Sequence, residues 1–353
     1  MMVVPLEILV VVLAIEGALL ALAIGLLGGI EAWRWSSGRR ERPVLAWGGG
    51  VLASSVAGRA LTDSELRQLQ ALPIRLRETL FVDLSRTLGH GHHARLAILA
   101  ADVGLITWAE ARCRSRLWWR RLHGVRLLTV LGEGERVIGP MLADVHPEVR
   151  AAAALGAVNH PIEQVVGGLL TLLTDPFGLC RFNAQGSLQR LGSTAVRPVA
   201  TYLAAGPRGG LEGALMVAIS IAEPAFGPAA RALAHDPSAQ VRGLATSLLA
   251  AIGGPDERDE LAQRLDDPEP EVRARAARGL GVLAHWPAAA AVAGLLGDPD
   301  WRVRRESALA LRGMGAPGLL LLRRSMASPD RFASDMARHV LDLSEPVSYV
   351  SVA

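Results

Sequence analysis

The 353-residue sequence predicts an all-α protein, an α-solenoid of about seven helix pairs preceded by one transmembrane helix. An Asp that precedes an Arg by six residues recurs with a period of about 31 residues, and such a period is typical of helical repeat proteins. Half of the residues are apolar but only 4% are aromatic, so small aliphatic side chains suited to close helix packing fill the interior. An apolar segment near the N-terminus is long enough to cross a bilayer.

The transmembrane helix is predicted at residues 3–31. Residues 8–30 would span roughly 34 Å as a helix, which covers the hydrocarbon core of a bilayer. No Lys or Arg precedes this segment, whereas arginines follow it from Arg34 onward, so the positive-inside rule places the N-terminus outside and the repeats in the cytoplasm, at the inner membrane. A cleaved signal peptide fits less well, because a positive n-region and a small-residue cleavage motif are missing.

Small residues line one stripe of the predicted transmembrane helix. Gly25 and Gly29 have the G-x-x-x-G spacing that lets two helix backbones approach closely. Glu16 lies on the opposite side, where a carboxylate facing lipid is costly, so a partner helix would supply an Arg or a hydrogen bond. The alternative is a protonated or snorkelling Glu16 in a single span that tolerates it.

The remaining chain divides into four parts. Residues 32–62 are predicted to be a basic juxtamembrane segment and a linker, because they are glycine-rich and have little periodicity. Residues 63–115 form a predicted helical N-terminal cap. The repeat solenoid is expected at 116–343, and the tail at 344–353 lacks a helical pattern.

Five copies of the repeat motif keep the same frame, and four of them have Pro directly after the Asp. An Asp followed by Pro predicts a helix start, because the carboxylate accepts an orphan N–H and Pro loses no hydrogen bond there. A further unit lies between the second and third copies, with Gly206 at the Asp position and Glu212 at the Arg position. The motif pairs are Asp144 and Arg150, Asp175 and Arg181, Asp236 and Arg242, Asp267 and Arg273, and Asp298 and Arg304.

The pattern D-P-x-x-x-V-R-x-x-A-x-x-x-L resembles the HEAT-repeat family, in particular the short bacterial HEAT-like repeats that also occur in phycobilin lyases. The resemblance covers about residues 121–343. It implies that the motif Asp and Arg side chains form a structural ladder between successive repeats and are not catalytic. Gly206 and Glu212 depart from the pattern, and such a gap marks a bend, a binding patch or a degenerate repeat.

Residues 112–126 hold six arginines, no acidic residue and the pair Trp118 and Trp119. Such a surface is suited to phosphates, anionic lipid headgroups or an acidic loop of a partner. The alternative places Trp118 on the core stripe and the arginines on an ordinary solvated face. The candidate partner-binding residues are Arg112, Arg114, Arg116, Trp119, Arg120 and Arg121.

Eight acidic residues lie between positions 256 and 271, so the charge of the repeats changes sign along the chain. This separation favours oriented docking beside a membrane or a protein over wrapping of nucleic acid.

No catalytic or metal-binding constellation is evident in the sequence. All 37 cations are arginines, which excludes a Schiff-base lysine and a P-loop lysine. The two cysteines are too few for a disulfide framework or a cysteine metal site. His90, His92 and His93 lie close together, but glycines mark a turn there and a fourth ligand is missing. We expect no cofactor and no enzymatic activity.

We therefore expect a membrane-anchored cytoplasmic scaffold that binds a partner protein. The family resemblance implies an accessory role beside a membrane enzyme, for example a polysaccharide-making glycosyltransferase. Two alternatives stay open. One is a lyase or another enzyme subunit that binds a small ligand, and the other is a binder of anionic lipid or, less favoured, nucleic acid through the arginines of residues 112–126.

Overall fold

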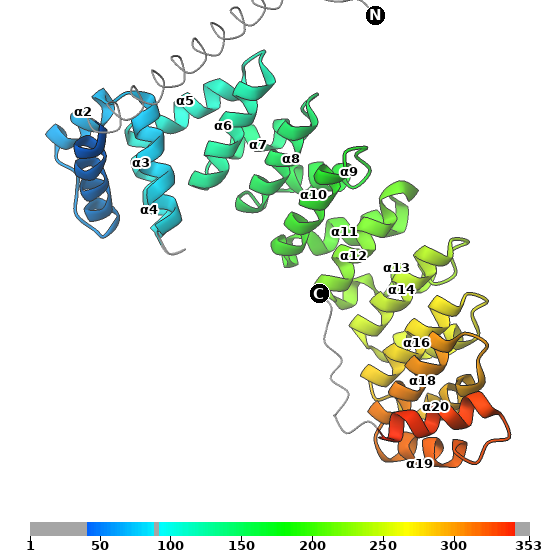
Figure 1. Cartoon of the computed structure of the whole chain (residues 1–353). Coiled ribbons are helices and arrows are strands. Elements are labelled where there is room, and N and C mark those ends of the chain that lie inside the picture. Colours follow the sequence, from blue (N-terminus) through cyan, green and yellow to red (C-terminus); the bar gives the residue numbers. More distant parts are fainter. Residues whose placement is uncertain (1–40, 88–91, 343–353) are drawn as a thin grey trace, which may run out of the picture. The chain divides into compact units, whose positions relative to one another are not determined.

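The computed structural model describes residues 41–87 and 92–342, and these residues form helices joined by turns, without a strand among them (Figure 1). They divide into two compact units. Unit 1 holds the described residues up to Ala111 together with residues 130–133, and unit 2 holds residues 112–129 and those from 134 onward. The prediction of an all-α protein is confirmed for this part of the chain.

Unit 1 begins with a helix over residues 41–56, where the sequence predicts a linker at 32–62. The helix forms because it buries Leu52 and Val56 on one face. Gly48, one of the glycines that indicated flexibility, lies in helix and faces Leu80, whose Cδ1 atom would be 2.8 Å from a Cβ at position 48. The glycine therefore allows a close helix contact instead of breaking the helix.

Four more helices follow in the first part of the chain. They lie in residues 63–115, where the sequence predicts a helical N-terminal cap. A capping box between Thr62 and Glu65 fixes the first turn, and hydrogen bonds from Arg59 and from the Thr62 backbone lower the pKa of Glu65 to about 2. The helices are α2 (Asp63–Ala71), α3 (Ile74–Thr87), α4 (His93–Asp102) and α5 (Leu105–Cys113).

Unit 2 contains helix pairs that repeat along the chain (Figure 1). The first helix of each pair follows the motif position, and from α8 onward these helices pack against one another in chain order. They are α6 (Trp118–Leu131), α8 (Pro147–Gly156), α10 (Gly178–Leu191), α12 (Leu211–Ile221), α14 (Ala239–Ile252), α16 (Pro270–Val282), α18 (Trp301–Gly313) and α20 (Arg331–Asp342). The second helices are α7 (Glu135–Met141), α9 (Glu163–Leu172), α11 (Ser193–Ala205), α13 (Gly227–Leu233), α15 (Pro255–Gln263), α17 (Ala289–Gly294) and α19 (Ala316–Ser325).

The core of unit 2 consists of small aliphatic side chains on the facing sides of these helices. In α16 the apolar positions of the motif are fully buried, at Val272, Ala276, Ala277 and Leu280. Close packing also depends on glycine. A Cβ at Gly318 would lie 1.8 Å from the Leu311 carbonyl oxygen, so α18 and α19 pack closely because this position has no side chain.

The motif Asp does not cap its helix, contrary to the prediction from the Asp-Pro sequence. In α16 the N-cap is Glu269, two residues after Asp267. The Asp267 carboxylate accepts the backbone N–H of Glu269 at 2.9 Å and so closes a turn before the helix starts. Its remaining lone pairs are therefore available to the preceding repeat.

In the described part of the chain, no helix is long and apolar enough to cross a membrane. The predicted transmembrane helix at 3–31, with Glu16, Gly25 and Gly29, lies outside the described residues, as does the tail at 344–353.

Candidate partner-binding surface

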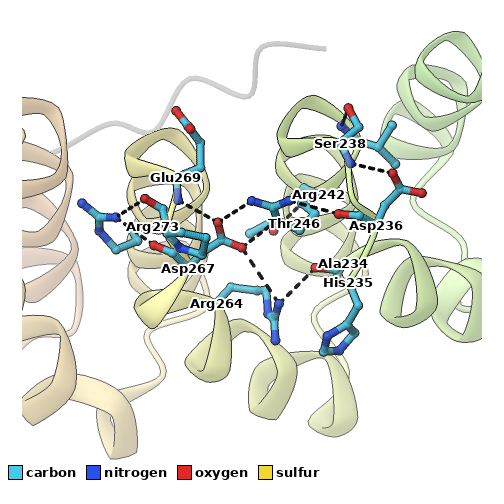
Figure 2. Close-up of polar contacts among 12 residues, drawn as sticks. Ala234, His235, Asp236, Ser238, Arg242, Thr246, Arg264, Asp267, Glu269 and Arg273 are labelled. Carbon is cyan, nitrogen blue, oxygen red and sulfur yellow. Dashed lines mark hydrogen bonds and ion pairs between the residues drawn. The ribbon is translucent and has the colours of Figure 1, made fainter.

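The motif residues form an Arg–Asp ladder between neighbouring repeats, and Figure 2 shows one complete rung. Arg242 of α14 donates from Nε and Nη2 to the two carboxylate oxygens of Asp267, each at 2.9 Å. Its Nη1 donates to the carbonyl oxygens of Asp236 at 3.0 Å and Pro237 at 3.3 Å. One guanidinium thus holds the turn of its own repeat and the carboxylate of the next.

Three other rungs have the same bidentate geometry. The donor side chains in the four rungs are 12–16% exposed and the carboxylate side chains 2–7% exposed, so each ion pair is largely shielded from water. The Nε to Oδ2 distances are 2.6 Å for Arg121 and Asp144, 2.7 Å for Arg150 and Asp175, and 2.8 Å for Arg273 and Asp298. Arg121, a predicted partner-binding residue, is therefore occupied within the ladder.

Burial and hydrogen bonding act in opposite directions on the ladder carboxylates. Burial raises the pKa of Asp144, Asp175 and Asp267, because a desolvated carboxylate prefers to be neutral. The hydrogen bonds from the ladder arginines and from the backbone N–H two residues on outweigh burial. The net pKa of each of these carboxyls lies below its ordinary value, and the rungs are ionised at neutral pH.

The ladder is interrupted between α10 and α12. Arg181 donates from Nη1 to the carbonyl oxygens of Asp175 at 2.6 Å and Pro176 at 3.1 Å, as the other motif arginines do. Its Nε and Nη2 find no carboxylate among the described residues, because Gly206 takes the Asp position. The Arg181 side chain is accordingly exposed, unlike the arginines of the four regular rungs.

The next rung is completed by a residue from a different position. Glu212 stands where the motif has Arg, and Arg208 donates instead to the Asp236 carboxylate, with its Nη1 2.9 Å from Oδ2. Arg208 comes from the short 3-10 turn before α12 and its side chain is 65% exposed, so this rung is much more open to solvent than the regular ones.

Three apolar side chains that are wholly or partly exposed lie close to Arg181 in the sequence. Phe177 is the N-cap of α10, and Leu179 and Phe182 are three residues apart in its first turns, with Phe182 70% exposed. We call Phe177, Leu179, Arg181 and Phe182 the α10 patch. Sequence reasoning missed its apolar members. A comparison of the motif copies would show one of them, since only the copy that begins at Asp175 has Phe two residues after the Asp, where others have Glu269 or Ser238.

The arginine cluster of residues 112–126 has a divided role. Arg121 belongs to the ladder, and Arg112 is partly buried and has contacts of its own. The other four side chains are exposed and have no carboxylate partner in the described part of the chain. These four are Arg114, Arg116, Arg120 and Arg126.

The two tryptophans of this cluster differ in environment. Trp118 stacks on His146 with ring centroids 3.9 Å apart and an interplanar angle of 2°, so it bridges two repeats and does not lie in the core stripe. Trp119 packs edge-on against Trp118 at 6.1 Å and is 53% exposed. In the same helix, Leu122 and Val125 are buried.

The acidic stretch at 256–271 is less of an acidic surface than the sequence suggests. Glu257 and Glu260 are buried, and they form ion pairs with Arg231 and Arg264 respectively. Asp267 belongs to the ladder. The chain itself neutralises much of this charge.

The histidines do not form a described metal site. His90 lies outside the described residues, His92 is the N-cap of α4, and His93 begins that helix. Within residues 41–87 and 92–342, no group of three or more His, Cys, Asp or Glu is arranged to hold a metal ion.

Comparison with known proteins supports the repeat assignment. Residues 258–341 match the family model described as HEAT repeats, and no curated protein matches the sequence. The karyopherin Kap121p, solved bound to the SUMO protease Ulp1p, is 14% identical with a TM-score of 0.55, over 75% of this chain and 35% of that chain. A Kap121p mutant gives 14% identity and a TM-score of 0.54, over 82% and 38% of the two chains.

An engineered protein is 19% identical over 78% of this chain and 87% of that chain, with a TM-score of 0.39. The chain spans little more than a third of Kap121p, and identities this low establish the fold alone. Residues 258–341 carry HEAT repeats, and the described chain has the fold of a HEAT- or armadillo-like solenoid.

Proposed function

We propose that this protein is a membrane-anchored scaffold that binds a partner protein through its repeats between residues 112 and 212. The observation that carries the proposal is the concentration of unsatisfied side chains in this region. Trp119 and Phe182 are more than half exposed, and eight of the twelve arginines there lack a carboxylate partner within the described part of the chain. Aromatic and Arg side chains supply much of the binding energy in protein interfaces.

The charge of this region fits an acidic protein surface. Residues 112–212 contain twelve arginines and seven acidic residues, whereas residues 213–342 contain fifteen arginines and sixteen acidic residues. An excess of cations on one part of a solenoid steers an anionic partner and fixes the orientation in which it docks.

The membrane part of the proposal rests on the sequence of residues 3–31 and the arginines that follow it. This anchor would hold the repeats at the cytoplasmic face of the inner membrane and restrict their partners to proteins found there. A polysaccharide-making glycosyltransferase is the partner that the family resemblance favours, and this choice is an analogy at the level of the family.

The test is purification of the full chain from native membranes in a mild detergent. The wild type is expected to retain a stoichiometric protein, and the triple variant Arg114→Glu, Arg116→Glu, Arg120→Glu is expected to lose it. The matched control reverses two exposed arginines of α19, Arg323→Glu and Arg324→Glu, and should retain the partner. A wild type that brings down no stoichiometric protein contradicts the proposal.

A second candidate is binding of anionic lipid or nucleic acid by Arg114, Arg116, Arg120 and Arg126. It is favoured by the exposure of all four within a short segment. Its signature is an affinity for phosphatidylglycerol vesicles or an oligonucleotide that falls steeply with salt, because such binding releases counterions. A flat salt response excludes it.

The proposal assigns no enzymatic activity to the chain. A lyase-like or other enzyme subunit would instead bind a small ligand. A pigment or nucleotide that is retained through purification favours that alternative over a scaffold.

A further inference from the structure

The interrupted rung leaves the Arg181 guanidinium in the position where the arginines of the regular rungs bind a carboxylate. Arg150, Arg242 and Arg273 each use Nε and Nη2 for the two oxygens of an Asp in the next repeat. Arg181 keeps the Nη1 bonds to its own turn, which hold the side chain in the same frame. A planar fork that is already oriented loses little conformational freedom when a carboxylate binds.

The packing around Gly206 leaves no room for a side chain that could bind Arg181. A Cβ at Gly206 would lie 2.5 Å from the Tyr202 carbonyl oxygen and 2.8 Å from its ring, so a side chain at the Asp position requires Tyr202 to shift. Arg208, which follows two residues later, is engaged with Asp236. The unfilled rung is therefore built into the packing of α11 and the turn after it.

The first turns of α10 also carry exposed apolar side chains. Leu179 and Phe182 lie one turn apart on α10 and are both exposed, and Phe177 is partly exposed at the start of that helix. Exposed apolar side chains on the same helix as an oriented Arg offer a partner both an apolar and a charged contact.

We propose that an acidic side chain of the partner protein binds Arg181 and completes the ladder in trans, while an adjacent apolar side chain packs on Leu179 and Phe182. This inference rests on the proposed function, because it names the chemistry by which the partner is recognised. The excess of arginines in residues 112–212 makes the site complementary to an acidic segment.

The neighbouring charge limits the recognised sequence. Glu212 is exposed on α12, which packs against α10, and it occupies the motif Arg position without an ion pair to Arg181 within the described residues. It would repel a second carboxylate in that direction. The site therefore prefers a single Asp or Glu flanked by apolar residues over an acidic run.

The experiment uses the full chain in detergent and a displayed library of random 12-residue peptides. Enriched peptides are expected to carry one acidic residue within two positions of an aromatic or aliphatic residue. The best peptide should bind Arg181→Ala and Phe182→Ala about tenfold or more weakly than the wild type, as expected for a bidentate pair with an apolar anchor. The control Arg197→Ala removes an exposed arginine of α11 and should leave the affinity unchanged.

A second arm changes the peptide, and its measurement on the wild-type protein stands even if Arg181→Ala folds poorly. The peptide with Asp→Asn or Glu→Gln should lose about as much affinity for the wild type as the original peptide loses for Arg181→Ala, and the two losses should not add. Peptides that bind the wild type and both patch variants equally overturn the inference but leave the proposed function standing. A library that yields no peptide also overturns the inference, whether or not the protein binds phosphatidylglycerol vesicles. The co-purification experiment then tests the proposed function separately.

Discussion

The repeats of residues 112–212 and those of residues 213–342 share one architecture but differ in how their polar groups are satisfied. In the later repeats the rungs Arg242–Asp267 and Arg273–Asp298 are complete, and many neighbouring charges pair with one another. The last motif arginine, Arg304, has no carboxylate partner among the described residues, and its guanidinium lies over the Phe332 ring, 4.5 Å from the centroid. In the earlier repeats one rung is open at Arg181, and exposed arginines lie beside exposed aromatic side chains.

This difference separates side chains that build the solenoid from side chains left for another molecule. The family model matches residues 258–341, where the motif is regular and its charges are used internally. The departures from the motif at Gly206 and Glu212 lie in the region where most arginines have no carboxylate partner among the described residues. A repeat that loses its own ladder residues can present the remaining ones to a partner.

The largest expected effect is loss of a complete rung. Asp267→Ala should lower the free energy of unfolding by about 3 kcal/mol, because it leaves the largely buried Arg242 guanidinium without its anion. Chemical denaturation followed by circular dichroism measures this. Asp259→Ala removes an exposed acid that has no described partner and should change the free energy of unfolding by less than about 0.5 kcal/mol. Equal effects of the two changes would mean that the ladder contributes nothing to stability.

Filling the open rung with a side chain should be harmful. Gly206→Ala should lower the free energy of unfolding by about 1–2 kcal/mol, because its Cβ would press on the Tyr202 carbonyl. Gly186→Ala in α10 has open space around its Cβ and should raise it by about 0.5–1 kcal/mol. Thermal denaturation of both variants shows whether each change raises or lowers the stability. A neutral or stabilising Gly206→Ala would show that the rung can be refilled without strain.

The substituted rung should be weaker than a regular one. Arg208→Ala should lower the free energy of unfolding by about 1 kcal/mol or less, because this pair is mostly exposed on the Arg side. Arg273→Ala, which breaks a shielded pair, should lower it by about 3 kcal/mol. Urea titration of the two variants compares the rungs directly, and an effect of Arg208→Ala as large as that of Arg273→Ala would contradict the comparison.

The smallest effect concerns pH. The pKa of Asp267 in the folded chain lies below the ordinary Asp value of about 4. The stability that its ionisation contributes is therefore complete above about pH 4 and is lost as the pH falls through the folded pKa. The stability difference between the wild type and Asp267→Asn should be constant from pH 7 to about 5 and shrink below pH 4. Urea titrations at several pH values test this, and a difference that grows on acidification would have the wrong sign.

Much of the solenoid could be predicted from the sequence, because periodicity reports which face of a helix is buried. The stripe of Val272 and Leu280 and the motif frame follow from spacing alone. The helix at 41–56 could not be predicted, since three glycines indicate flexibility unless the packing partner of Gly48 is known. The role of Asp267 was also mistaken, because its partner Arg242 belongs to another repeat.

The candidate surface was predicted only in part. The sequence locates the arginines of residues 112–126, but it does not show that Arg121 is consumed by Asp144 while Trp119 stays exposed. The replacement of a motif Arg by Arg208 depends on the direction of one short turn, which no local pattern encodes. Contacts between repeats decide which charges remain free.

Site-specific photo-crosslinking in intact membranes tests the central claim most directly. A photoreactive phenylalanine analogue replaces Trp119 or Phe182 in the early repeats, and Trp286 or Trp301 in the late ones. These four side chains are 53%, 70%, 64% and 57% exposed, so they are matched in accessibility. We predict that the first two sites crosslink to one and the same protein and that the last two do not. Crosslinks confined to Trp286 and Trp301, or none at any site, would contradict the assignment of partner binding to the early repeats.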